Sequence, residues 1–154
     1  MNPPFCDIIQ AVESAMSGKP KILVVEDETP VSMMMMFLLT RAGYETEVAS
    51  TGKEALQKTE ENDFDLLTLD VDLPDISGFE VCRRLKNNPV WRDTPVVFVS
   101  GRLHEQDRKR GIALGAADHI TKPFDADDFV ARIRPHVKTG GEVNLLEITR
   151  KDSH

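Results

Sequence analysis

The chain has 154 residues, a formal net charge of −7 at pH 7 and two cysteines, and this length suits a single domain with its own hydrophobic core. The negative charge argues against a surface that binds nucleic acid, because phosphate backbones require clustered lysine and arginine. No apolar run is long enough to cross a membrane and residues 1–17 lack the pattern of a signal peptide, so we expect a cytoplasmic protein without membrane contact.

The chain begins with an arm, residues 1–20, whose apolar residues recur at helical spacing. This spacing predicts a short amphipathic helix within the arm. Gly18 and Pro20 separate the arm from the domain, which we assign to residues 21–138, and a tail or linker follows at residues 139–154. The apolar positions of the arm are Phe5, Ile8, Ile9, Val12 and Met16.

Five segments have the composition of β-strands. The stretch 66–69 reads LLTL and is bounded by turn residues, which is typical of a strand buried on both faces of a parallel sheet. Segments 21–25 and 95–99 are similarly apolar, so these three strands are expected to be central. The more polar segments 44–49 and 118–121 are expected to be edge strands.

Five helical segments alternate with these strands. Pro30 suits the first turn of a helix, Ser77 with Glu80 matches a capping box, and Asp125 marks a further helix start. The alternation predicts a doubly wound α/β fold of the flavodoxin-like type. Its five-stranded parallel sheet has the strand order 2-1-3-4-5, with helices on both faces. The predicted helices cover 29–41, 51–62, 77 to before Pro89, 105–114 and 125–137.

Reactive side chains follow four of the predicted strands. Glu26 and Asp27 come after the first, Asp70 after the third, Ser100 after the fourth and Lys122 after the fifth. The carboxyl ends of parallel strands share one edge, so these side chains converge. Clustered carboxylates repel unless a cation joins them, and oxygen ligands suit Mg2+. Lysine and serine suit phosphoryl oxygens, and a carboxylate beside the metal can attack phosphorus to form an aspartyl-phosphate.

Four stretches together resemble the receiver domains of two-component response regulators, the chemotaxis-regulator-like superfamily: KILVVEDE, LLTLDVDLPDISGFE, VVFVSG and GAADHITKPF. The resemblance covers residues 21–138. It implies that Asp70 accepts a phosphoryl group from a sensor histidine kinase or a phosphotransfer protein, as in a phosphorelay. It also implies that Glu26, Asp27 and Asp70 hold Mg2+, Asp27 more directly than Glu26, with the backbone carbonyl of Asp72 as a further ligand.

The same resemblance assigns roles in switching. Lys122 contacts the phosphoryl group, Ser100 is the hydroxyl that moves toward it, and the Lys122–Pro123 bond is expected to be cis. Phosphorylation then shifts a pre-existing equilibrium of the face formed by the fourth helix, fifth strand and fifth helix. That face binds a downstream protein target or controls an output domain. The protein is thus not a turnover enzyme but a phosphoacceptor that takes part in its own phosphotransfer and dephosphorylation.

Two residues depart from the family pattern. His119 stands where the second switch residue is usually tyrosine or phenylalanine. We hypothesise that its imidazole moves between an exposed and a buried position, and that the population of the buried position depends on pH. The alternative is a partly exposed edge-strand histidine without a switching role. Asp72 is an acid two residues after the phosphoacceptor, and we expect it to affect the lifetime of the phosphoryl group.

The sequence also leaves other functions open. Asp70-Val71-Asp72 resembles the nucleophile motif of haloacid-dehalogenase-type phosphatases. In that family the motif is expected on an early strand and is followed by a cap domain, whereas here it follows the third predicted strand. A pseudo-receiver that no longer takes phosphate is a second alternative, against which the full set of side chains argues. A receiver fragment of a longer regulator or hybrid kinase is a third.

Four successive methionines, Met33 to Met36, cover every side of the first domain helix, so some must face outward. We hypothesise that the N-terminal arm covers this exposed face. It would do so within one chain or across a homodimer.

Overall fold

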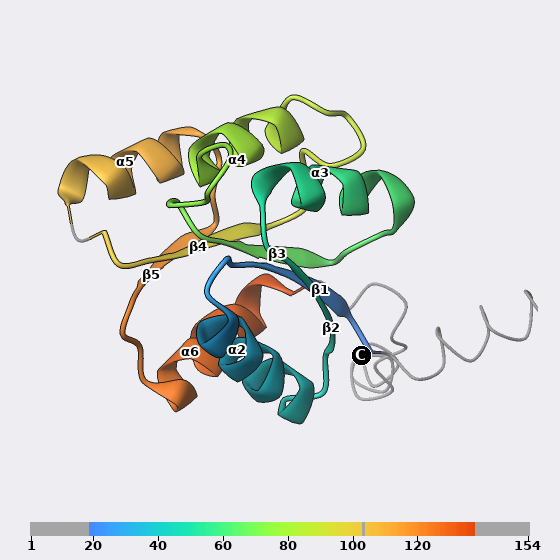
Figure 1. Cartoon of the computed structure of the whole chain (residues 1–154), viewed down its shortest axis with the longest axis vertical. Helices are drawn as coiled ribbons and strands as arrows, with labels where there is room; N and C mark the ends of the chain where they lie inside the picture. The colour runs from blue at the N-terminus through green and yellow to red at the C-terminus, as the bar shows by residue number, and fades with distance from the viewer. Residues whose placement is uncertain (1–18, 103, 138–154) are drawn as a thin grey trace, which may run out of the picture.

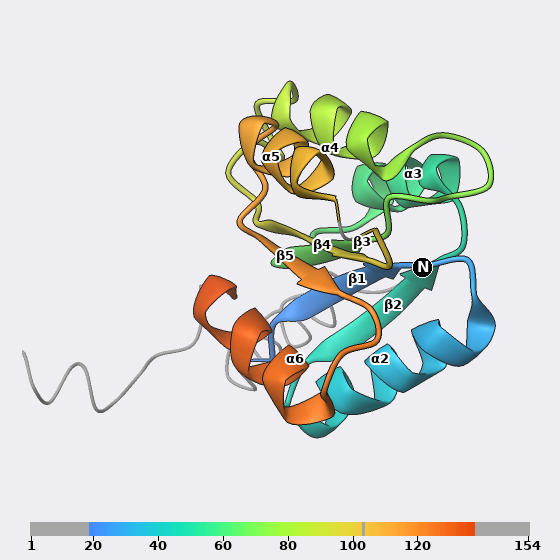
Figure 2. The same ribbon diagram turned by 90° about the vertical axis from the view of Figure 1, so that its left-hand side faces the viewer.

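The computed structural model describes residues 19–102 and 104–137. One five-stranded sheet forms the middle layer, with helices above and below it (Figure 1). The strands are β1 (Lys21–Val25), β2 (Glu45–Ala49), β3 (Leu66–Leu69), β4 (Val96–Ser100) and β5 (Asp118–Thr121). They pair in parallel in the order β2-β1-β3-β4-β5, and Figure 2 shows β1, β2 and β5 directed toward the same end of the sheet. The predicted fold class and strand order are confirmed.

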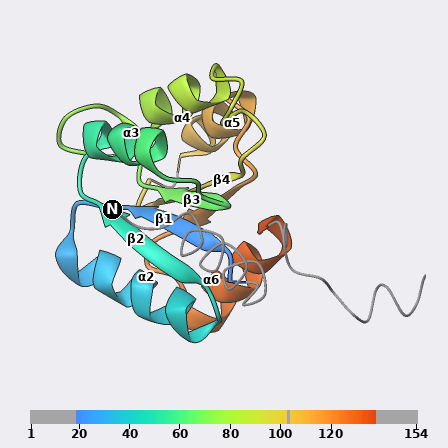
Figure 3. The same ribbon diagram turned by 90° about the vertical axis from the view of Figure 1, so that its right-hand side faces the viewer.

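Within the described residues there are five α-helices, α2 (Thr29–Arg41), α3 (Gly52–Glu61), α4 (Gly78–Lys86), α5 (Glu105–Ala113) and α6 (Ala126–Ile133), and the short 3-10 helix η1 (Arg134–His136) follows the last of them. Helices α3, α4 and α5 cover one face of the sheet, and α2 and α6 cover the other (Figures 1 and 3). None of the helices in these described ranges is long and apolar enough to span a membrane.

The three central strands supply the core on both faces. Every residue of β3 and β4 is buried, because a strand covered by helices on both sides has no polar face. Side chains therefore alternate between two apolar clusters. One cluster, beneath α3 to α5, includes Leu67, Leu69 and Phe98, and the other, against α2 and α6, includes Met35 and Phe129.

The helix ends agree with the predictions only in part. The Ser77 hydroxyl accepts the Phe79 N–H at 3.1 Å, so Ser77 caps α4. The predicted capping box itself does not form, because the Ser77 hydroxyl accepts from Phe79 instead of Glu80 and the Glu80 carboxylate pairs with Arg83 and Arg84. The last helix ends at Ile133, four residues before the predicted end, and continues as η1. Pro135 within η1 has no N–H to donate to an α-helical bond.

The methionine run lies as expected. Met35 is buried, whereas Met33 and Met34 are 63% and 45% exposed on α2. The neighbouring Phe37 is also exposed, at 62%. The predicted arm helix and the tail at 139–154 lie outside the described residues, so the hypothesis that the arm covers this face stays a prediction.

Candidate functional site

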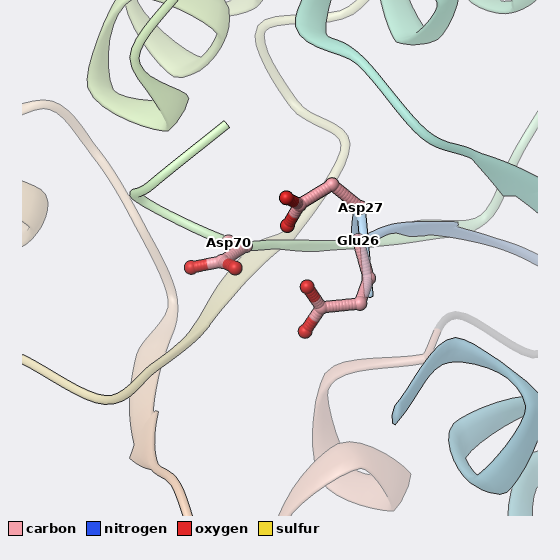
Figure 4. A group of neighbouring side chains, drawn as sticks. All are labelled: Glu26, Asp27 and Asp70. Carbon is pink, nitrogen blue, oxygen red and sulfur yellow. The ribbon is translucent and has the colours of Figure 1, made fainter. Parts of the chain in front are cut away.

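Three carboxylates meet at the carboxyl edge of the sheet. Glu26 and Asp27 directly follow β1, and Asp70 directly follows β3. Strands β1 and β3 are hydrogen-bonded neighbours, and the Asp70 N–H donates to the Val25 carbonyl at 3.0 Å. Carboxylate oxygens of the three acids lie within 4.8 Å of one another and face a common space (Figure 4). The strand order thus brings together acids that are 43 or more residues apart in the chain.

Lys122 lies between two of these carboxylates. Its ammonium group donates one hydrogen bond to Glu26 and another, of 3.1 Å, to Asp70. Strand β5 pairs with β4 so that Thr121 lies opposite Ser100, and the Lys122 N–H donates to the Ser100 carbonyl at 2.9 Å. The structure therefore brings Lys122 and Ser100 to the same edge as the acids. The Lys122–Pro123 bond is cis, as expected.

The site is more enclosed than a strand end facing solvent. Asp70 is only 5% exposed, Glu26 2% and Ser100 0%. Burial raises the pKa of Glu26 to about 7, and the charge of Asp70 adds to this while the Lys122 hydrogen bond opposes it. Burial alone would lower the pKa of Lys122, but its bonds to Glu26 and Asp70 outweigh burial and raise it. Lys122 is therefore held charged between two acids.

The donor set fits a hard divalent cation such as Mg2+. Glu26, Asp27 and Asp70 present only oxygen atoms, and the exposed Asp27 leaves room for the waters that Mg2+ retains. When all three acids are ionised, the single ammonium of Lys122 leaves excess negative charge, which a divalent cation would offset. The backbone carbonyl of Asp72 as a further ligand stays a prediction.

The raised pKa of Glu26 predicts how stability depends on pH. An acid whose pKa rises from 4.5 in the unfolded chain to about 7 in the folded one binds its proton more tightly when folded. The free energy of unfolding of the metal-free protein is therefore expected to fall as pH rises between these values, by at most about 3 kcal/mol. Urea unfolding across this range, with a chelator present, measures the effect. The Glu26→Gln variant should lose most of it, and an unchanged pH curve in that variant would contradict the assignment.

An ion pair that the sequence analysis missed joins two loops at this edge. Arg102, after β4, donates to Asp72, after β3, through Nη2 at 2.6 Å and through Nε at 2.9 Å. These bonds lower the pKa of Asp72 and raise that of Arg102. Both side chains are about half exposed, so solvent screens the pair and it contributes little to stability. The sequence could have suggested this pair only through the predicted topology, which places the loops after β3 and β4 at the same edge of the sheet.

His119 lies on β5, outside the acidic cluster. Its ring is half-buried and meets the Phe98 ring edge-on, with centroids 6.5 Å apart. Burial, followed by the charge of Arg108, lowers its pKa below the ordinary value of 6.5, so the ring is neutral at neutral pH. Its Nε2 atom has no hydrogen-bond partner among the described residues. The switching role of His119 stays a prediction.

Comparison with known proteins identifies the family of the chain. Residues 22–134 match the family model of the response regulator receiver domain. The chain is 35% identical over 128 residues to the response regulator ArlR of Staphylococcus saprophyticus, covering 83% of this chain and 57% of ArlR. It is 40% identical over 115 residues to the phosphate regulon transcriptional regulatory protein PhoB of Rhizobium meliloti, covering 75% of this chain and 51% of PhoB. The chain thus spans about half the length of these curated relatives.

Solved structures show the same fold. A crystal structure of a putative response regulator from Chloroflexus aurantiacus has a TM-score of 0.74 at 32% identity, covering 77% of this chain and 97% of that one. A CheY-like receiver domain protein from Methanospirillum hungatei has a TM-score of 0.72 at 28% identity, covering 76% and 92%. Sequence and fold therefore agree, and the chain belongs to the response regulator receiver domains of two-component signalling.

Proposed function

We propose that this receiver accepts a phosphoryl group on Asp70 in a Mg2+-dependent reaction. The observation that carries the proposal is the position of the Asp70 carboxylate, which is buried at the sheet edge with Lys122 on one side and two further acids within 4.8 Å. A lone buried carboxylate in this setting is costly, whereas a carboxylate next to a fixed ammonium and a cation site is suited to phosphoryl chemistry.

The chemistry follows from the side chains. A carboxylate oxygen of Asp70 forms a bond to phosphorus, the bond from phosphorus to the donor histidine nitrogen breaks, and its electron pair stays on that nitrogen. Lys122, which is hydrogen-bonded to Asp70 before the reaction, would neutralise charge on the phosphoryl oxygens. Glu26 and Asp27 would hold Mg2+, which when bound supplies positive charge at the same oxygens. The donor would be a sensor histidine kinase or a phosphotransfer protein.

The signal is proposed to leave the site through the face formed by α5, β5 and α6. The Ser100 hydroxyl, which accepts the Arg102 N–H at 3.2 Å, would turn toward the phosphoryl group, and His119 would follow. Strand β5 and α6 are joined by Arg132, whose Nη2 donates to Asp118 at 2.7 Å and to the His119 carbonyl at 3.0 Å. A shift of β5 would therefore also move α6, through the hydrogen bonds of Arg132.

The output is proposed to be a protein target or an output domain, in a cytoplasmic setting. Several relatives, PhoB among them, are transcriptional regulators about twice the length of the matched segment. The receiver itself, in a chain of net charge −7, is not expected to bind nucleic acid directly. Nor is it expected to turn over a substrate, because Asp70 is the phosphoacceptor.

Intact-mass analysis after incubation with acetyl phosphate and Mg2+ tests the proposal. We expect one phosphoryl adduct, absent when a chelator removes Mg2+ and absent in Asp70→Asn. The matched control is Asp65→Asn, because Asp65 lies at the opposite end of β3, where it accepts the Lys21 N–H. That variant should still be labelled. No adduct in the wild type, with beryllofluoride also failing to perturb the protein, would favour a pseudo-receiver. Steady turnover of a generic phosphomonoester would instead favour a phosphatase.

A further inference from the structure

The loop that follows the phosphoacceptor, residues 71–77, is hydrogen-bonded to the start of α3 through one carboxylate. Asp75, five residues after Asp70, accepts the Gly52 N–H with Oδ1 and the Lys53 N–H with Oδ2, both at 2.8 Å. Gly52 and Lys53 are the first two residues of α3, more than 20 residues away in the chain. These hydrogen bonds lower the pKa of Asp75 even though burial opposes the shift, so its carboxylate is charged at neutral pH.

Helix α3 has a cap of its own within its own segment. The Thr51 hydroxyl accepts the Glu54 N–H at 3.0 Å, and the Thr51 carbonyl accepts the Ala55 N–H. A cap of this kind satisfies the third helical N–H and leaves the first two free to bond elsewhere. The Asp75 carboxylate accepts both of these N–H groups. Asp75 therefore connects α3 to the 71–77 loop, which a cap within the helix's own segment cannot do.

The helix and the loop also touch closely. A Cβ atom on Gly52 would lie 2.4 Å from Cγ1 of Ile76, in the loop, and 2.9 Å from Cγ2 of Val81, on α4, so these side chains pack directly against the backbone at the start of α3. At the other side of the loop, the Asp72 N–H donates to Asp70 Oδ1 at 3.1 Å. The loop is thus held between the phosphoacceptor on one side and α3 on the other.

We infer that Asp75 is a positioning residue, which through α3 holds the 71–77 loop, and with it the Asp72 carbonyl, in place for Mg2+. This inference rests on the proposed function, because it takes that carbonyl as a metal ligand. Mg2+ demands nearly ideal octahedral geometry, so small displacements of a ligand weaken its binding. Loss of groups that orient metal ligands typically lowers affinity about 10- to 100-fold, and Asp75 acts one step further out, so we expect about 5- to 10-fold.

Calorimetric titration of the full chain with Mg2+ tests this, with Thr51→Ala as the matched control. Both Asp75→Ala and Thr51→Ala remove an acceptor from the same helix start, and both should lower the urea midpoint. Of these two variants, Asp75→Ala alone should raise the Kd for Mg2+, by about 5- to 10-fold. Asp75→Asn keeps one carbonyl acceptor and should show a smaller rise. In the metal-free protein, amide exchange at Gly52 and Lys53 should be faster in Asp75→Ala than in the wild type.

The outcomes separate the two proposals. If Asp75→Ala and Thr51→Ala bind Mg2+ with the same Kd as the wild type, Asp75 is only a helix cap and the inference is wrong. An equal rise in both variants would mean that general loosening of α3 is the cause, which also overturns it. If the wild type itself neither binds Mg2+ nor is labelled on Asp70, the proposed function fails instead. Should Asp75→Ala not fold, the comparison of Asp75→Asn with Thr51→Ala decides.

Discussion

Replacing Lys122 with methionine is expected to lower the free energy of unfolding by about 3 kcal/mol at about pH 8 and to slow the labelling of Asp70 strongly. Methionine has a similar length but no charge, so Glu26 and Asp70 would lose their shared cation. Their side chains are 1% and 7% exposed, and water cannot replace the lost hydrogen bonds fully. Removing one partner of a buried ion pair costs more than the pair contributes, because the remaining charges stay buried.

The effect should depend on pH. Near pH 5.5, below the Glu26 pKa of about 7, Glu26 carries a proton and only Asp70 loses a partner, so the loss of stability should be smaller. Urea unfolding in chelator at the two pH values measures this, together with intact-mass labelling by acetyl phosphate. Lys53→Met, at an exposed lysine on α3, is the control and should change neither quantity. An equal loss at both pH values would contradict the role of Glu26.

The Gly78→Ala variant is expected to lose about 3 kcal/mol of stability or more and to be labelled poorly on Asp70. Gly78 begins α4, and a Cβ atom there would lie 2.0 Å from the Asp70 carbonyl oxygen and 3.0 Å from the Val71 Cα. Both neighbours are backbone atoms, so no side chain can turn away. Relief requires either Asp70 or the start of α4 to move, and both also hold the 71–77 loop.

Thermal or urea unfolding of Gly78→Ala measures this loss, with Gly101→Ala as the control. Nothing lies within 4 Å of a Cβ at Gly101, and Gly101 does not have a positive φ. That variant should stay within about 0.5 kcal/mol of the wild type. The prediction is wrong if the two alanine variants are equally stable, because the close approach at Gly78 would then be relieved without cost.

Much of the architecture was predictable from local patterns. The apolar run at 66–69 and the one at 95–99 indicated strands buried on both faces, and β3 and β4 are fully buried. Alternation with helical segments then left few topologies, since parallel strands need crossover helices and their carboxyl ends share an edge. This rule alone predicted that Asp70, Lys122 and the acids after β1 would converge. Hydrophobic burial determines these features, and the pattern of apolar residues along the chain shows which segments are buried.

What only the tertiary structure decided is how polar groups pair across loops. The sequence placed Lys122 near the acids but did not indicate that it bonds both Glu26 and Asp70. Nor did the sequence reveal the pairing of Arg102 with Asp72. Such contacts depend on loop paths and side-chain rotamers, and residues more than 20 positions apart carry no local signal of them. The bonds from Asp75 to α3 belong to this class, because they exist only once the sheet has brought the two segments together.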